Sequence, residues 1–136
     1  MIGCVIVSHG ELGKALLATA KEIVGEVSST VAISVPRSAG LDDIRARILD
    51  AVREVDCGYG VIVLADVFGG TAANVALGLV DEHPVEVITG MNLPMVLKLA
   101  NVQRTSTDLF ALAQLLKYYG QRNVIVASEA LKERGP

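Results

Sequence analysis

The stretch Val61-Ile62-Val63-Leu64-Ala65 holds five apolar residues in succession and is followed by Asp66. A strand with one face in water alternates polar and apolar residues, whereas an uninterrupted apolar run of this length indicates a strand buried on both faces. Such strands are typical of parallel sheets that helices cover on both sides. The run therefore predicts an α/β fold, and the apolar run at residues 2–7 supports the same conclusion.

The rest of the chain alternates segments with helical spacing and short apolar runs. The apolar spacing predicts helices from Leu12 to about Gly25, across Asp42 to Val55, and from Thr71 to about Val80. A short helix is expected after Asn92, and another from Leu109 to Tyr119, capped by Ser106 or Thr107 and stopped at Gly120. Further strands are expected at 31–35, 85–89 and 124–127, before a polar tail at about 128–136.

This alternation predicts a single α/β domain over residues 1–136. We expect a doubly wound, mainly parallel sheet with the strand order 2-1-3-4 and helices on both faces. The strand at Val124–Ala127 either joins the sheet of its own subunit or is exchanged in a dimer.

Composition excludes several classes of protein. No apolar run approaches the ~18 residues of a membrane span, and the N-terminal apolar stretch lacks the basic region of a signal peptide. We therefore expect a cytoplasmic protein without direct membrane insertion. A net charge of -3 with interspersed signs, and only 4% aromatic residues, does not favour nucleic acid. Cys4 and Cys57 are expected to be free thiols, and no metal or cofactor is expected.

His9 and Asp66 follow the first and third predicted strands. In a sheet of order 2-1-3-4 the winding direction reverses between these strands, and ligands of doubly wound sheets bind at that point. A carboxylate bonded to one ring nitrogen fixes the histidine tautomer and leaves the other nitrogen as a nucleophile. The pair is therefore the candidate reactive centre; the alternative is that Asp66 only caps the following turn.

Gly69-Gly70-Thr71 lies where a helix opens after a strand. Backbone N–H groups, the helix dipole and the threonine hydroxyl favour an anion there. The alternative is that the glycines only let the chain turn. The segment is neither a P-loop nor a GxGxxG dinucleotide fingerprint.

Three motifs together resemble one family. Ser8-His9-Gly10, Asp66-Val67-Phe68-Gly69-Gly70-Thr71 and Thr89-Gly90-Met91-Asn92-Leu93-Pro94-Met95 stand in the order found in the mannose/fructose/sorbose-family enzyme IIA component of the bacterial phosphoenolpyruvate-dependent sugar phosphotransferase system. The resemblance implies a phosphotransferase component in which His9 accepts a phosphoryl group from the phosphocarrier protein HPr. His9 would pass it to an enzyme IIB partner, in sugar uptake or its regulation. It also implies that Asp66 orients the imidazole and that Gly69, Gly70 and Thr71 hold the phosphoryl group. A homodimer is implied too, in which the strand at 124–127 crosses to the other subunit.

The face around His9 is expected to dock both partners through apolar residues of the neighbouring loops. These residues are Leu12, Phe68, Met91, Leu93 and Met95. The alternative for Met91 and Met95 is that they fill gaps in the core. Arg37, in the loop after the second strand, either meets the phosphoryl group or the partner, or is simply solvated. No role is expected for the isolated His83.

Three other functions compete with this one. The phosphotransferase subunit of a dihydroxyacetone kinase system also uses a histidine after the first strand of a similar fold. A tetrapyrrole metal chelatase needs a second histidine or a glutamate beside the first, and the turns near His9 offer Asp66, Thr89 and Asn92 instead. A dimeric binding module without phosphorylation would have an inert His9.

Overall fold

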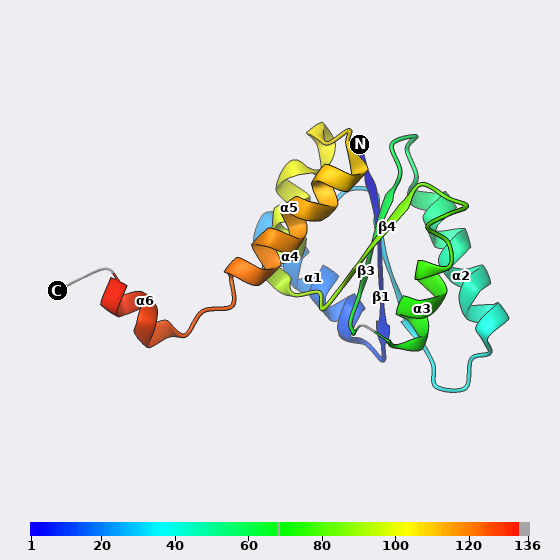
Figure 1. Cartoon of the computed structure of the whole chain (residues 1–136), viewed down its shortest axis with the longest axis horizontal. Helices are drawn as coiled ribbons and strands as arrows, with labels where there is room; N and C mark the ends of the chain where they lie inside the picture. The colour runs from blue at the N-terminus through cyan, green and yellow to red at the C-terminus, as the bar shows by residue number, and fades with distance from the viewer. Residues whose placement is uncertain (68, 134–136) are drawn as a thin grey trace.

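The computed structural model describes residues 1–67 and 69–133. Within them, four parallel strands form one sheet (Figure 1). The strands are β1 (Gly3–His9), β2 (Thr30–Val35), β3 (Val61–Ala65) and β4 (Val85–Thr89). They lie in the order β2-β1-β3-β4, which confirms the predicted parallel sheet and its strand order.

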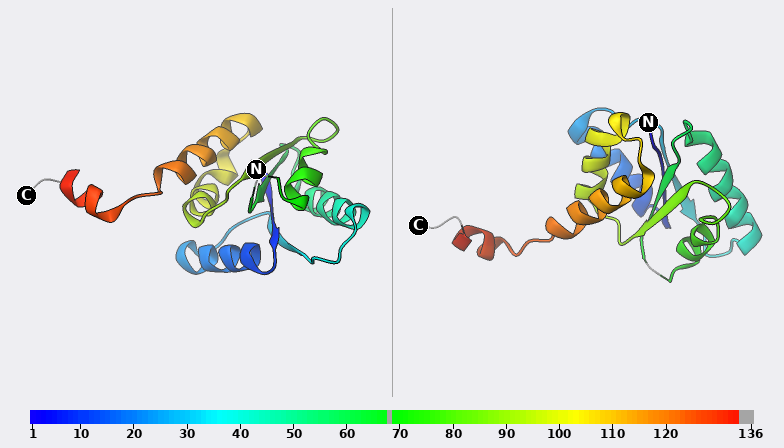
Figure 2. Two further views of the ribbon diagram at one scale, coloured as in Figure 1. Left: turned by 60° about the horizontal axis from the view of Figure 1, so that its bottom comes forward. Right: turned by 45° about the horizontal axis from the view of Figure 1, so that its top comes forward.

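Helices cover both faces of the sheet, as predicted (Figures 1 and 2). One face carries α1 (Leu12–Val24), α4 (Leu93–Val102) and α5 (Leu109–Arg122), with the 3-10 turn η1 (Gln103–Thr105) between the last two. The other face carries α2 (Leu41–Val55) and α3 (Thr71–Leu77). None of the helices in the described ranges is both long and apolar enough to span a bilayer.

The two central strands supply the core on both sides. Cys4 and Ile6 of β1 pack in the cluster under α1, α4 and α5, whereas Val5 and Val7 pack in the cluster under α2 and α3. Strand β3 divides its residues in the same way. Because successive side chains of a strand point to opposite faces, a strand between two helical layers is apolar at every position. This is why the run at 61–65 does not alternate.

Most predicted helix ends agree with the structure, and α5 begins at Leu109 as predicted, but its cap residue and its C-terminal end differ. Asp108 caps it, accepting a hydrogen bond from the backbone N–H of Ala111 at 3.0 Å, in place of the expected Ser106 or Thr107. The helix also continues through Gly120 to Arg122. A Cβ on Gly120 would lie 2.6 Å from Cε of Met95, so this glycine lets α4 and α5 approach and does not stop the helix.

The other helices are closer to expectation. Asn92 caps α4 as predicted, accepting a hydrogen bond from the backbone N–H of Met95 at 3.1 Å. Gly25 follows α1 with φ +88° and ψ -67°, a backbone conformation that residues with a Cβ rarely adopt, so a glycine suits the end of this helix. Helix α3 ends at Leu77, three residues earlier than expected.

The predicted strand at Val124–Ala127 is not a strand in the single chain. Residues 124–126 carry no regular structure, and α6 (Ala127–Glu133) occupies most of the expected polar tail. The chain leaves the body of the molecule after α5 (Figures 1 and 2), and this segment pairs with no strand of its own sheet. Val124, Ile125 and Val126 are therefore 78%, 61% and 59% exposed.

Candidate active site

The pairing of β1 with β3 brings His9 and Asp66 to the same edge of the sheet. Val7 lies opposite Ala65 in the parallel register, so strands β1 and β3 end side by side, and the residues that follow them are neighbours. Oδ2 of Asp66 accepts the backbone N–H of His9 at 2.8 Å and lies 2.7 Å from Nδ1 of the imidazole. Oδ1 of Asp66 accepts the backbone N–H of Val67 at 2.9 Å. One carboxylate thus fixes both the main chain and the ring of His9.

These contacts also set the protonation state of Asp66. Partial burial raises the pKa of its carboxyl group, but the hydrogen bonds from the backbone and ring of His9 and from Val67 outweigh this effect and lower the pKa. An ionised carboxylate can only accept, so the proton of the shared hydrogen bond lies on Nδ1 of His9. The other ring nitrogen, Nε2, then carries a lone pair. The His9 side chain is 55% exposed and that of Asp66 only 10%, so the imidazole faces solvent while its carboxylate partner is largely buried.

A hydrogen bond from helix α1 to the buried Ser8 holds the turn that carries His9. Ser8 is buried, and its hydroxyl accepts the backbone N–H of Gly13 at 2.8 Å. Helix α1 has no side-chain cap at Glu11, so Ser8 supplies one acceptor for the first turn of the helix. Gly10 has φ +54°, and nothing lies within 4 Å of where its Cβ would be. The turn needs this left-handed conformation to send the chain from strand into helix.

Gly70 lies against the ring of His9, and Thr71 lines a hollow beside it. A Cβ on Gly70 would lie 3.3 Å from Cε1 of His9, and Thr71 lines a hollow of about 240 Å³ together with His9 and Arg37. Gly69 adopts φ +81°, and its carbonyl accepts a hydrogen bond from the Asn74 side chain at 3.3 Å. The structure therefore gathers the glycine-rich turn beside the histidine, while Phe68 lies outside the described residues.

A larger hollow of about 650 Å³ also opens beside His9 and shares Arg37 with the smaller one. It is lined by His9, Gly10, Glu11, Ser34, Val35, Pro36, Arg37 and Arg47. Arg37 is among the residues predicted near the site, whereas Arg47 is not. Arg47 lies one turn after the buried Ile44 and is half-buried at the edge of the sheet. The i+3 spacing from Ile44 was the signal that this side chain points toward β2.

The predicted docking residues separate into two groups. Leu12 is 52% exposed beside the His9 turn and remains available to a partner. Met91 and Met95 are buried in the core under α4 and α5, and Leu93 is partly buried against the same cluster. The methionines therefore fill the core, the second of their two predicted roles, and offer little surface for docking.

Two further expectations concern titratable groups. His83 precedes β4, at the end of the sheet opposite His9. In the ranges 1–67 and 69–133, no group of three His, Cys, Asp or Glu side chains gathers as metal ligands. Cys4 is buried and Cys57 exposed, both as free thiols.

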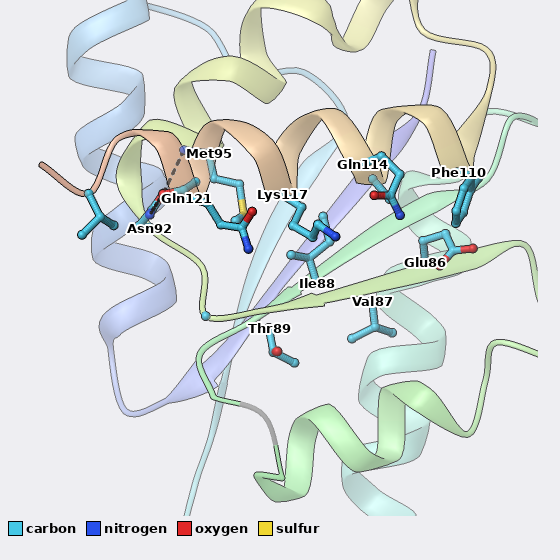
Figure 3. A pocket seen from close by; sticks show the side chains of 14 residues that line it. Glu86, Val87, Ile88, Thr89, Asn92, Met95, Phe110, Gln114, Lys117 and Gln121 are labelled. Atoms are coloured by element: carbon cyan, nitrogen blue, oxygen red, sulfur yellow. Dashed lines mark hydrogen bonds between the residues drawn. The ribbon is translucent and has the colours of Figure 1, made fainter.

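A separate hollow of about 440 Å³ lies between β4 and α5 (Figure 3). Ile88 of β4 and Lys117 of α5 point toward one another there. Val124, the first residue of the exposed C-terminal segment, also lines the hollow. Strand β4 is at the edge of the sheet, so the hollow lies beside an edge that pairs with no other strand of the described chain.

The sheet order and the helices on both faces define a doubly wound α/β protein, with an exposed, carboxylate-bonded histidine at its switch point. Residues 3–115 match the family model described as PTS system fructose IIA component. The chain belongs to this family, the enzyme IIA components of the mannose/fructose/sorbose type, and is therefore a phosphotransferase component.

Individual relatives agree with the family match. The PTS system fructose-specific EIIA component of Bacillus subtilis is 28% identical over 98% of this chain and 91% of its own length. Among solved structures, the mannose/sorbose-specific IIA subunit from Enterococcus faecalis is 30% identical over 92% of this chain and 93% of that one, with a TM-score of 0.81. The EIIA component from Streptococcus agalactiae is 25% identical, covers 95% of this chain and 99% of that one, and has a TM-score of 0.85.

Proposed function

We propose that this chain carries a phosphoryl group on Nε2 of His9, accepting it from HPr and passing it to an enzyme IIB component. The observation that supports this most is the bond between Nδ1 of His9 and Oδ2 of Asp66, 2.7 Å long, on a ring that is 55% exposed. It leaves Nε2 with its lone pair and in reach of another protein.

The transfer step follows from this protonation state. The Nε2 lone pair attacks phosphorus in line with the donor's N–P bond, which breaks with its electron pair remaining on the donor nitrogen. A donor phosphohistidine protonated on its second nitrogen leaves as a neutral imidazole. The His9 ring keeps its Nδ1 proton, becomes positively charged as the new N–P bond forms, and is stabilised by the adjacent Asp66 carboxylate. Transfer to the acceptor is the reverse of these steps.

Gly69, Gly70 and Thr71 are proposed to hold the phosphoryl group. Gly70 lies beside the ring, and Thr71 shares a hollow with His9 into which its hydroxyl can donate. Bringing donor nitrogen, phosphorus and acceptor nitrogen into line is the main requirement of such a transfer, because the enzyme needs to do little covalent chemistry itself.

The experiment that tests this function is intact-protein mass measurement after incubation with phosphoenolpyruvate, enzyme I and HPr. Wild type is expected to gain one acid-labile phosphoryl group and His9→Ala none. His83→Ala is the matched control, since it removes the other histidine at the far end of the sheet and should be phosphorylated like wild type. No gain by wild type, with HPr shown to be phosphorylated, would contradict the proposal and favour a non-phosphorylated binding module.

The acceptor is tested with the phosphorylated protein. Mixed with enzyme IIB proteins of mannose, fructose and sorbose systems, it should lose its phosphoryl group to the cognate one fastest. Failure of all of them would favour a regulatory role over sugar uptake. We place both exchanges in the cytoplasm, where HPr and enzyme IIB are expected.

We also propose that the chain is a homodimer in which residues 124–127 of one subunit pair with β4 of the other. Three apolar β-branched residues, Val124, Ile125 and Val126, are more than half exposed, and the edge of β4 offers unpaired backbone groups. The hollow between β4 and α5 contains apolar side chains such as Ile88 and Phe110, and Val124 lies at it. A strand of the other subunit that pairs with β4 would cover these side chains. Deletion from Asn123 onward should convert the dimer to a monomer in sedimentation velocity, and an unaltered profile would reject the exchange.

A further inference from the structure

We propose that Arg37 binds the phosphoryl group carried by His9, with its guanidinium donating to the phosphoryl oxygens. The inference rests on the proposed phosphorylation of His9 and adds to it a cationic residue from the loop after the neighbouring strand β2.

The sheet register places Arg37 close to the reactive ring. His9 lies opposite Val35 in the parallel pairing of β1 with β2, and Arg37 follows Val35 by two residues. Arg37 lines both hollows that His9 lines. In the smaller one, of about 240 Å³, Thr71 and Arg37 are the other polar side chains. A group bonded to Nε2 and lying in this hollow would have a hydroxyl and a guanidinium among its neighbours.

The charges around the site support an anionic occupant. In residues 1–67 and 69–133 the ion pairs join His9 to Asp66, Arg45 to Glu82, and Arg104 to Glu26. Arg37 and Arg47 form none of these pairs, although both line the larger hollow. The acid of that hollow, Glu11, lies within hydrogen-bond distance of Ser34, with Oε1 3.4 Å from the serine Oγ. Two guanidiniums therefore stand beside His9 without a carboxylate of the described chain bonded to either.

A guanidinium fits the chemistry of this step. Its planar fork donates two parallel N–H groups to two oxygens of a phosphoryl group and remains protonated throughout. In phosphoryl transfer the charge is spread over the three equatorial oxygens, and cationic groups that face them stabilise the transition state. Arg37 forms and breaks no covalent bond: the phosphoryl group moves between the donor nitrogen and Nε2, and the proton on Nδ1 of His9 stays there, donated to the Asp66 carboxylate. Arg47 lines only the larger hollow, so we assign the direct contact to Arg37 alone.

The test is the single-turnover rate of phosphorylation by phospho-HPr, measured over a range of donor concentrations. Arg37→Gln should lower the rate constant at saturating donor by about tenfold or more, because charge-assisted hydrogen bonds to the moving group are lost. Arg37→Lys should restore part of the rate, since the charge returns without the fork. Arg53→Gln is the matched control: it makes the same change of charge on the exposed side of α2 and should stay within about twofold of wild type.

A second readout separates contact with the phosphoryl group from a structural or docking effect. In the phosphorylated proteins, the phosphorus NMR resonance of His9 should move in Arg37→Gln relative to both wild type and Arg53→Gln. Equal saturating rates and an unmoved resonance in Arg37→Gln would overturn the inference. A change confined to the donor concentration needed for half-maximal rate would do so too, because it would assign Arg37 to an acidic group of the partner. If wild type itself is not phosphorylated by active phospho-HPr, the proposed function fails first, and this inference with it.

Discussion

A side chain on Gly70 would press on the ring of His9, because a Cβ at that position lies 3.3 Å from Cε1 of the imidazole and 3.1 Å from Cγ2 of Val67. Gly70 has φ -70° and ψ 158°, which any residue adopts. The glycine is therefore needed for space and not for backbone freedom.

The first prediction follows from this spacing. Gly70→Ala should displace the His9 ring by a few tenths of an ångström and slow phosphorylation by about tenfold, since transfer depends on alignment. Its free energy of unfolding should fall by only about 1 kcal/mol. Single-turnover kinetics and urea denaturation measure the two effects. A variant that transfers as fast as wild type would show that the ring tolerates the added methyl group.

The second prediction concerns Asp66→Asn. The amide can still accept a hydrogen bond from Nδ1, but it no longer stabilises the positive ring that forms on phosphorylation. Transfer should slow by at least about tenfold while the fold remains intact. Phosphorylation kinetics and circular dichroism check this, and unchanged transfer would remove Asp66 from the site.

The third prediction concerns how the free energy of unfolding of wild type and of Asp66→Asn depends on pH. The pKa of Asp66 is lower in the folded protein than in the unfolded chain. Between the two pKa values the unfolded chain therefore binds more protons, and the free energy of unfolding rises with pH. The stability that Asp66 contributes should be complete above the ordinary carboxyl pKa of 3.8 and be lost as the pH falls through the lowered value. In urea denaturation, the difference between wild type and Asp66→Asn should shrink below about pH 4. A difference that is constant down to acid unfolding would contradict the lowered pKa.

The fourth prediction compares two glycines that differ in their surroundings. A Cβ on Gly3 would lie 2.2 Å from the carbonyl oxygen of Val55, a backbone atom that cannot rotate away. Gly3→Ala should therefore lower the free energy of unfolding by about 3 kcal/mol or more. Gly40→Ala is the control, because its φ is -76° and nothing lies within 4 Å of its Cβ position, and it should stay within about 1 kcal/mol of wild type. Equal stability of the two variants would show that α2 moves freely away from β1.

The fifth prediction concerns the two thiols. Burial raises the pKa of the Cys4 thiol and excludes reagents from it, whereas Cys57 is exposed. Iodoacetamide should modify Cys57 alone in the native protein and both cysteines in denaturant, as followed by intact mass. Rapid native modification of Cys4 would indicate that β1 opens locally.

The fold was predictable because the two central strands are apolar at every position, a pattern that parallel sheets between helical layers require. The helix ends were harder to predict, because several neighbouring residues can each cap or end a helix. Ser106, Thr107 and Asp108 are three consecutive cap residues, and the choice of Asp108 depends on turning Leu112 and Leu116 into the core, where both are buried. In the sequence, a glycine that ends a helix looks the same as a glycine that lets another helix pack closely, and Gly120 is of the second kind.

The site was only partly predictable for a similar reason. His9 and Asp66 end adjacent strands, so strand order alone brings them together. The position of Arg47 depends on how α2 is rotated over the edge of the sheet, and the burial of Met91 and Met95 depends on how closely α4 and α5 pack. The segment at 124–126 has the composition of a strand but pairs with no strand of its own sheet, and the sequence shows the composition alone.

The double attachment of His9 to one oxygen of Asp66 has a consequence for recognition. Since the same oxygen atom binds the backbone N–H and the ring of His9, the imidazole is already held in one rotamer before a partner binds. The orientation of Nε2 is therefore set by the folded chain alone. In the proposed transfer, two proteins with unrelated surfaces then exchange a phosphoryl group at this nitrogen without either having to orient the ring. Discrimination between partners is left to the residues around the rim, which are free to diverge while the chemistry at the centre stays the same.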